Sequence, residues 1–298
     1  MPAARRPGRI TVTGASGLVG RAVVAHLSAA GHEVTALHRS GIPAGLESAA
    51  SWLQLDLTSS EAPQAIARLS PDGLIHCAAM IPQAFDGESA ARAAACNRSM
   101  DDAIIDAAPR GCRVVYLSSV SVYGMGPDVF DEDSEPHPIG PYAEAKLASE
   151  ALMANLDEYA ILRISAAYGP GQATQTVLRL FISLALQGSD LNYHGSGARC
   201  QDFVWVSDIA AAAGGALSAR SLNGVFNVAS GQPIAMVDLA QLVVDVTASS
   251  SEIAPSGQAD PQEHHRARYD LRRIVTSLGW RAETDLAEGI RLVAASPT

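Results

Sequence analysis

Short apolar segments alternate with longer segments of helical periodicity through the first half of the chain. The apolar segments cover residues 9–13, 33–37, 51–55, 73–77, 113–117 and 160–164. The segments with helical periodicity include residues 18–30, 89–107 and 142–156. This alternation predicts a parallel sheet with helices on both faces and a ligand site beyond the carboxyl ends of the strands.

The alternation changes beyond residue 166. We expect strands over residues 202–206 and 225–228 and helices over residues 174–187, 207–217, 237–247, 271–278 and 285–293. Residues 248–261 are rich in Ser, Pro and acidic side chains and are expected to form a loop. The fold class is therefore α/β, with a doubly wound parallel sheet in residues 1–165 to which residues 202–247 return. Residues 166–201 and 248–298 are expected to form a small C-terminal lobe.

A glycine-rich turn follows the first expected strand. Gly14, Gly17 and Gly20 stand three residues apart where that strand gives way to a helix. Glycines permit a tight turn and a close approach of the backbone to a pyrophosphate, while the helix N-terminus supplies unpaired N–H groups. This context predicts a Rossmann-type dinucleotide site rather than an ordinary structural turn. The expected cofactor contacts are Gly14, Ser16, Gly17, Leu18 and Val19.

The end of the second strand indicates which dinucleotide binds. In NAD-binding folds an acidic residue at this point accepts hydrogen bonds from the ribose hydroxyls. This chain has Leu37, His38, Arg39 and Ser40 there, without Asp or Glu. Arg39 carries a planar cation that suits a phosphate group, so we expect NADP(H) to be preferred. NAD(H) is the alternative if Arg39 is only a solvated loop residue.

Three side chains form a candidate acid–base group. Tyr142 and Lys146 are four residues apart, so a helix places them on one face. A free tyrosine has a pKa of about 10, and a lysine cation one turn away, with a positive nicotinamide ring, would lower that pKa. Ser119 follows a strand and offers a hydroxyl to a substrate carbonyl or alkoxide. Taken singly, each feature also occurs on ordinary helices and loops.

Composition and charge narrow the class of protein. The chain has 298 residues, with 31 acidic against 21 basic side chains and a formal net charge of −10. This charge disfavours nucleic acid as a partner, and no apolar run is long enough to span a membrane. The four cysteines include no CxxC pair, and the adjacent His264 and His265 form no chelating motif. We expect a cytoplasmic protein without a metal site.

The motifs occur in an order that resembles a known family. They are TGxxGxxG at residues 13–20, Asp56 after the third strand, HCAA at 76–79, SSxxVYG at 118–124, YxxxK at 142–146, LRxxxxYGPG at 162–171, a DFVxVxD-like segment at 202–208, FNV at 226–228 and LGW at 278–280. Together they resemble the extended short-chain dehydrogenase/reductases, the NAD-dependent epimerase/dehydratase group. The resemblance covers almost the whole chain. It implies an NAD(P)-dependent oxidoreductase with a Rossmann domain and a small C-terminal substrate-binding lobe.

The resemblance also implies roles for individual residues. Ser119 would orient the substrate, Tyr142 would be the general acid and base, and Lys146 would bind the nicotinamide ribose and tune Tyr142. Asp56 and Leu57 would contact adenine. The remaining implied contacts are Ala78, Ala79 and Asn97 for the cofactor, and Met80, Ser121, Ala166, Arg199 and Gln201 for a small-molecule substrate. The helices over residues 89–107 and 142–156 would pair across a two-fold axis in a homodimer.

The chain departs from the group where substrates are recognised. Dehydratases of the group usually carry an acidic pair at the positions of Val120 and Ser121, so a dehydratase is disfavoured. Epimerases usually have Asn at the position of Ala166 and Arg at that of Gln201. Here the nearest arginine is Arg199, two residues before Gln201.

A further arginine of the group, which binds a substrate diphosphate, aligns loosely with Asp260. The usual diphosphate contacts are therefore weakened, or rebuilt with Arg199, Arg266 or Arg268.

These observations favour an NADPH-dependent ketoreductase that acts through Ser119, Tyr142 and Lys146. Its substrate would be a keto-sugar nucleotide or another polyhydroxylated or natural-product ketone. The first alternative is a nucleotide-sugar epimerase with tightly bound NAD. A more remote alternative is an NADP(H)-sensing protein without catalytic activity.

Overall fold

The computed structural model describes residues 8–82, 87–125, 129–266 and 268–296. Within these residues, seven parallel strands form one central sheet in the order β12-β7-β5-β4-β1-β2-β3. They are β1 (Arg9–Thr13), β2 (Glu33–His38), β3 (Ser51–Gln54), β4 (Gly73–His76), β5 (Arg113–Ser119), β7 (Tyr159–Ile164) and β12 (Gly224–Val228). All of β4 and nearly all of β5 are buried, as expected for strands that helices cover on both faces.

The strand order reverses beside β1. Val12 of β1 pairs with Ala36 of β2 on one side and with Ile75 of β4 on the other. The chain first builds outward through β2 and β3, then crosses over to β4, β5 and β7. Such a reversal is where open α/β sheets bind ligands, at the carboxyl ends of the strands. The doubly wound, Rossmann-type fold predicted from the sequence is confirmed.

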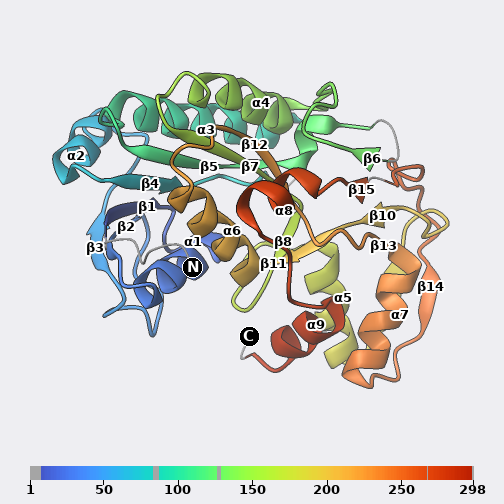
Figure 1. Ribbon diagram of the computed structural model, residues 1–298. Helices are drawn as coiled ribbons and strands as arrows, with labels where there is room; N and C mark the ends of the chain where they lie inside the picture. Colours follow the sequence, from blue (N-terminus) through green and yellow to red (C-terminus); the bar gives the residue numbers. More distant parts are fainter. Residues whose placement is uncertain (1–7, 83–86, 126–128, 267, 297–298) are drawn as a thin grey trace.

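Helices cover both faces of this sheet, as Figure 1 shows. On one face α1 (Leu18–Ala29) packs against α6 (Val206–Ser218), and the other face carries α2 (Ala62–Leu69), α3 (Gly87–Ala107) and α4 (Pro141–Met153). The helices α1 and α6 approach closely because α6 is built from small residues. A Cβ at Gly214 would lie 2.7 Å from the imidazole of His26. Helix α2 is too short to stand out as a periodic segment, and the sequence analysis did not predict it.

A second group of elements forms the C-terminal lobe. Phe181, Leu239 and Ile290 belong to one apolar cluster, which joins α5 (Val177–Leu186), α7 (Met236–Thr247) and α9 (Leu286–Ala294). Short strands pair beside these helices: β8 (Ala166–Tyr168) with β11 (Phe203–Trp205), β10 (Cys200–Gln201) with β13 (Ile234–Ala235), and β9 (Leu191–Tyr193) with β14 (Ile253–Pro255). The lobe lies to one side of the central sheet (Figure 1).

Four further short elements complete the described part of the fold. They are the single-turn helix η1 (Val120–Tyr123), the strand pair β6 (Val129–Phe130) with β15 (Arg268–Tyr269), and α8 (Arg272–Leu278). Tyr269 and Phe130 lie near the ring of Tyr123, with ring centroids 6.1 and 4.9 Å from it. The segment that follows β5 is therefore held to the C-terminal part of the chain.

Two features of the second half differ from the sequence-based expectation. Residues 248–261 do not form a loop throughout, because Ile253–Pro255 pairs with β9 as β14. Three residues are too few to leave a periodic pattern in the sequence. The segment 202–247 is also divided: α6 and β12 join the central sheet and its cover, whereas α7 packs in the lobe. The division of the chain into 1–165, 166–201 and 248–298 remains a proposal.

None of the helices in the described part of the chain is long and apolar enough to cross a lipid bilayer.

Candidate active site

The glycine-rich turn brings the start of α1 close to the end of β4. Gly14 has a φ of +61°, and a Cβ there would lie 2.6 Å from the backbone of Ala78. A Cβ at Gly20 would collide with the carbonyl oxygen of Gly14, so both positions require glycine. No side chain of the described residues caps α1, and its first turn has no acidic residue. The backbone at Leu18 and Val19 therefore presents a helix N-terminus that fits a dinucleotide pyrophosphate.

Ser16 and Gly17 complete this turn. The N–H of Gly17 donates to the carbonyl oxygen of Gly14 at 2.9 Å, which closes the turn. Gly17 is exposed and Ser16 is half-buried, so neither is enclosed by the core. The structure thus brings together all five residues expected in this part of the site.

The residues expected at the outer part of the cofactor site follow β2 and β3. Arg39 follows β2, its side chain is exposed, and it has no ion-pair partner among the described residues. Asp56 lies two residues past β3 and accepts hydrogen bonds from the backbone N–H and hydroxyl of Thr58 at 2.9 and 2.8 Å. These bonds, and more weakly the charge of Arg39, lower the pKa of Asp56. Leu57 is buried in the core beside α2.

Ser119, Tyr142 and Lys146 come from two adjoining elements. Ser119 ends β5, and its hydroxyl accepts a hydrogen bond from the N–H of Ser121 at 3.1 Å. Tyr142 and Lys146 lie one turn apart on α4 and are buried. Lys146 Nζ donates to the carbonyl oxygen of Leu117 at 3.0 Å, which fixes α4 against the end of β5.

Burial dominates the acid–base properties of this group. It raises the pKa of Tyr142 above its usual range, and the negative charge of Asp101 adds to the effect. It lowers the pKa of Lys146, although the charges of Asp101 and Glu150 oppose that shift. Tyr142 is therefore protonated at neutral pH, the form that donates a proton.

A buried hydrogen-bond network lies beneath Lys146, and the sequence analysis missed it. Lys146 Nζ donates to the hydroxyl of Tyr116 at 3.1 Å, and that hydroxyl donates to Oδ2 of Asp101 at 3.0 Å. The other carboxylate oxygen of Asp101 lies 2.8 Å from Nε2 of His76. One signal was present in the sequence: Asp101 follows Asn97 by four residues, so both lie on one face of α3.

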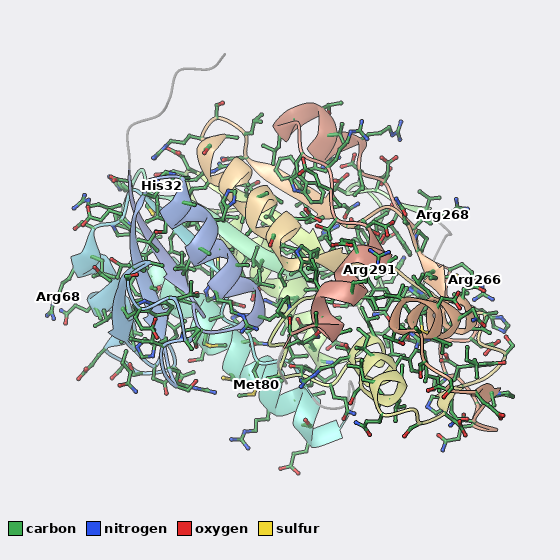
Figure 2. All side chains as sticks on the ribbon, turned by 90° about the horizontal axis from the view of Figure 1, so that it is seen from below. His32, Arg68, Met80, Arg266, Arg268 and Arg291 are labelled. Carbon is green, nitrogen blue, oxygen red and sulfur yellow. The ribbon has the colours of Figure 1, made fainter. Side chains whose placement is uncertain are left out.

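Asn97 fixes the backbone that follows β4. Its side chain is buried, accepts from the N–H of Met80 at 2.6 Å and donates to the carbonyl oxygen of Met80 at 3.0 Å. Ala78 and Ala79 directly precede Met80, which accepts one of these two hydrogen bonds and donates the other. Figure 2 shows Met80 beside α3. The residues expected at the nicotinamide side thus form one segment, which two hydrogen bonds hold to α3.

The expected substrate residues lie around the start of the lobe. The N–H of Ala166 donates to the carbonyl oxygen of Asp202 at 3.1 Å, next to Gln201 of β10. Arg199 Nε donates to Oδ2 of Asp260 at 2.8 Å. The residue that aligns with an expected diphosphate-binding arginine is therefore the ion-pair partner of Arg199.

The other candidate residues differ in how they are held. Arg266 donates to the carbonyl oxygens of Glu263 and His265, whereas Arg268 is exposed, and Figure 2 places both on the side of the small lobe. The hydroxyl of Ser121 is buried and has no hydrogen-bond partner among the described residues. Ser121 thus has an unused hydroxyl close to Ser119.

Solved structures share this architecture. The structure of MoeE5 in complex with UDP-glucose and NAD superposes with a TM-score of 0.82, is 27% identical and covers 96% of this chain and 97% of that chain. The UDP-glucose 4-epimerase of Thermus thermophilus in complex with NAD gives a TM-score of 0.81 at 25% identity, with 96% and 97% coverage.

Some relatives match nearly the whole length of this chain, whereas others match only part of it. The UDP-glucose 4-epimerase of Mycolicibacterium smegmatis is 30% identical over 95% of this chain and 96% of its own length. The GDP-6-deoxy-D-mannose reductase of Pseudomonas aeruginosa is 29% identical over 96% and 95%. The mouse dTDP-D-glucose 4,6-dehydratase is 29% identical, but the match spans only 60% of this chain and 54% of the mouse protein.

The family model for the NAD dependent epimerase/dehydratase family matches residues 10–229, which include the glycine turn, the serine segment and the Tyr–Lys pair. The resemblance seen in the ordered motifs is thereby confirmed. The chain belongs to the NAD-dependent epimerase/dehydratase family, the extended short-chain dehydrogenase/reductases.

Proposed function

We propose that this enzyme is an NADPH-dependent ketoreductase that acts on a keto-sugar nucleotide or another polyhydroxylated ketone. Arg39 is the observation that carries the proposal. Its exposed cation stands at the end of β2, where an NAD-specific fold has a carboxylate. A reductase consumes its cofactor in every turnover and so draws on NADPH, whereas an epimerase regenerates its cofactor within one cycle.

The buried residues of α4 and β5 account for the proton chemistry. When bound, the nicotinamide supplies the hydride that reduces the carbonyl carbon. Tyr142 donates the proton to the carbonyl oxygen, and the hydroxyl of Ser119 holds that oxygen. Lys146 stabilises the tyrosinate that remains, because its cation lies one helical turn away. The product is a secondary alcohol, and Tyr142 is reprotonated before the next turnover.

Relatives support a substrate of the nucleotide-sugar class. The reductase from Pseudomonas aeruginosa matches nearly the whole chain, including the lobe. Two relatives and the MoeE5 complex carry nucleotide sugars in their names.

The ion pair between Arg199 and Asp260 favours a substrate end with less negative charge than an open diphosphate. Asp260 takes up part of the charge that Arg199 would offer. Gln201, Ala166, Met80 and the free hydroxyl of Ser121 are the other contacts that we propose.

A nucleotide-sugar epimerase with tightly bound NAD is the second candidate. The similarity to the Mycolicibacterium smegmatis epimerase over 95% of this chain favours it. An NADP(H) sensor without catalysis is disfavoured, because the chain retains both Tyr142 and Lys146, and Lys146 is bonded to the end of β5.

The identity of the nucleotide bound to the protein distinguishes the reductase from the epimerase. Denaturing the purified protein releases any bound nucleotide for identification, and NADPH and NADH are then titrated separately. We expect little bound nucleotide and a preference for NADPH, which Arg39→Ala weakens about tenfold without affecting NADH. The matched control is Arg68→Ala, an exposed arginine on α2, which Figure 2 shows at one edge of the molecule. If the protein instead carries one equivalent of NAD that does not exchange, the reductase proposal is wrong and the epimerase is favoured.

We also propose a cytoplasmic homodimer in which α3 and α4 face a second copy. The exposed faces of these helices carry the small residues Ala91, Ala95, Ala148 and Ala151. Small side chains allow two helix pairs to approach closely. Sedimentation of the full chain would give the mass of a dimer if this is correct.

A further inference from the structure

Lys146 is a buried cation whose direct contacts are all neutral. It is the only lysine in the sequence, and it is 2% exposed. Nζ donates to the hydroxyl of Tyr116 at 3.1 Å and to the carbonyl oxygen of Leu117 at 3.0 Å, and lies 4.5 Å from the centroid of the Tyr116 ring. No carboxylate of the described residues lies within 4.0 Å of it. Because a buried cation is unstable without a counter-charge, an anion must act from beyond these contacts.

Asp101 is a carboxylate on the other side of the Tyr116 hydroxyl. It is 1% exposed and comes from α3, which packs beside α4. Oδ2 accepts from Tyr116 at 3.0 Å and from the hydroxyl of Ser149 at 2.6 Å, while Oδ1 lies 2.8 Å from Nε2 of His76. Three donors around two oxygens suit the ionised form, since a protonated acid would need an acceptor.

On its other side Asp101 contacts an imidazole. The N–H of Ala78 donates to Oγ1 of Thr13 at 3.3 Å, and Oγ1 of Thr13 lies 2.6 Å from Nδ1 of His76, whose Nε2 lies 2.8 Å from Asp101. Among the described groups bonded to Asp101 or to Tyr116, Lys146 is the only lysine or arginine side chain.

The other anionic groups near Lys146 act on it less than Asp101 does. Glu150 accepts from Arg163 through three hydrogen bonds of 2.7 to 3.2 Å and from Ser118 at 2.5 Å, so its charge is already paired. Cys77 follows β4, and burial raises the pKa of its thiol to about 12, so it is neutral near pH 7. Tyr142 is protonated before reaction for the same reason of burial.

We propose that Asp101 is a positioning residue, the counter-charge that keeps the ammonium of Lys146 protonated and held at the end of β5 through the hydroxyl of Tyr116. The inference rests on the proposed function in one respect: Lys146 must be a cation in order to stabilise the tyrosinate of Tyr142. Asp101 touches neither substrate nor cofactor in this account. Its charge reaches the reaction through Lys146.

The proposal fixes the direction of an electrostatic effect. A negative charge stabilises the protonated form of every acid near it. Replacing Asp101 with Asn removes that charge and keeps the size of the side chain. Lys146 and Tyr142 should then both lose their protons at lower pH than in the native protein.

The single lysine makes this effect measurable without a known substrate. The full chain is labelled with lysine that carries ¹³C at the ε carbon, and the single resonance is followed against pH, without and with NADP⁺. We expect Asp101→Asn to move the midpoint of Lys146 down by about one pH unit or more. A merely structural role would lower stability and leave this midpoint in place.

Asp202→Asn is the matched control. Asp202 is a second buried carboxylate, 3% exposed, which accepts from the hydroxyl of Ser165, from the hydroxyl and N–H of Ser230 and from the N–H of Gly231. It has no contact with Lys146 or Tyr116, so its removal should leave the Lys146 midpoint within a few tenths of a pH unit. Equal shifts in the two variants would overturn the proposal.

Tyr116→Phe keeps the proposal testable if Asp101→Asn does not fold. It removes the bridging hydroxyl and leaves the charge, so the midpoint of Lys146 should fall by less than in Asp101→Asn but measurably. An unchanged midpoint would show that the bridge has no role. Tyr142→Phe separates this inference from the proposed function: retained turnover in that variant would disprove the acid–base role of Tyr142, while the Lys146 titration would stand on its own.

Discussion

The two ends of the proposed site hold their charges in different ways. At the catalytic end Lys146 and Asp101 are 2% and 1% exposed, and a tyrosine hydroxyl separates them. At the substrate end Arg199 and Asp260 meet directly at 2.8 Å, and their side chains are 20% and 8% exposed. Buried charges are poorly screened, whereas water and salt screen accessible charges and weaken the attraction between them. The same kind of substitution should therefore have large effects at one end and small effects at the other.

The largest effect is expected at Tyr142. Tyr142→Phe removes the proton donor while keeping the ring that fills its site, so turnover of a ketone substrate should fall about 10²- to 10⁴-fold. Binding of NADPH, followed by fluorescence titration, should stay unchanged. Undiminished turnover would exclude this residue as the acid.

Two adjacent serines allow a sharper test of the catalytic end. Ser119 is half-buried at the end of β5, whereas Ser118 is buried and donates to Glu150 at 2.5 Å. Ser119→Ala should lower kcat about 10²-fold, because it removes a hydrogen bond to the developing oxyanion. Ser118→Ala should retain turnover and lower the free energy of unfolding by about 2 kcal/mol, since it removes a hydrogen bond to a charged group. If Ser118→Ala lowered kcat and Ser119→Ala did not, Ser118 and not Ser119 would bind the oxyanion.

A smaller effect is expected at the proposed substrate end. Hydrogen bonds from Gln262 and Arg199 outweigh the effect of burial and lower the pKa of Asp260. A carboxyl with a lowered pKa stabilises the fold above its unfolded pKa of about 3.9, and this contribution is lost as pH falls through the folded value. Asp260→Asn should therefore lower the free energy of unfolding by about 1 kcal/mol at neutral pH, and the difference from the native protein should vanish in acid.

An exposed ion pair provides the control for that measurement. Glu288 and Arg291 lie three residues apart on α9, away from the proposed dimer face, with side chains 51% and 57% exposed. Glu288→Gln should change the stability by less, about 0.2–0.5 kcal/mol. A larger loss here than at Asp260 would contradict the ranking of the two pairs by accessibility.

Most of the central sheet and the positions of the acid–base residues could be predicted from the sequence. The strands β1, β2, β4, β5 and β7 match the predicted segments to within two residues at either end, and the Gly14 turn follows β1 as expected. The helices α2 and α7 show the limits of such patterns. Helix α2 is too short to stand out, and the pattern of α7 predicts a helix without indicating the lobe against which it packs.

The local order of residues alone determined the glycine turn, the serine segment after β5 and the one-turn spacing of Tyr142 and Lys146. These features depend on periodicity and backbone freedom within a few residues, so a single sequence contains them. Only the tertiary structure decided that Asp101 of α3, Tyr116 of β5 and His76 of β4 meet beneath Lys146, and that Arg199 is paired with Asp260. Each of these partners comes from a different segment, and the energy of a buried charge depends on which segments packing brings within a few ångströms of it.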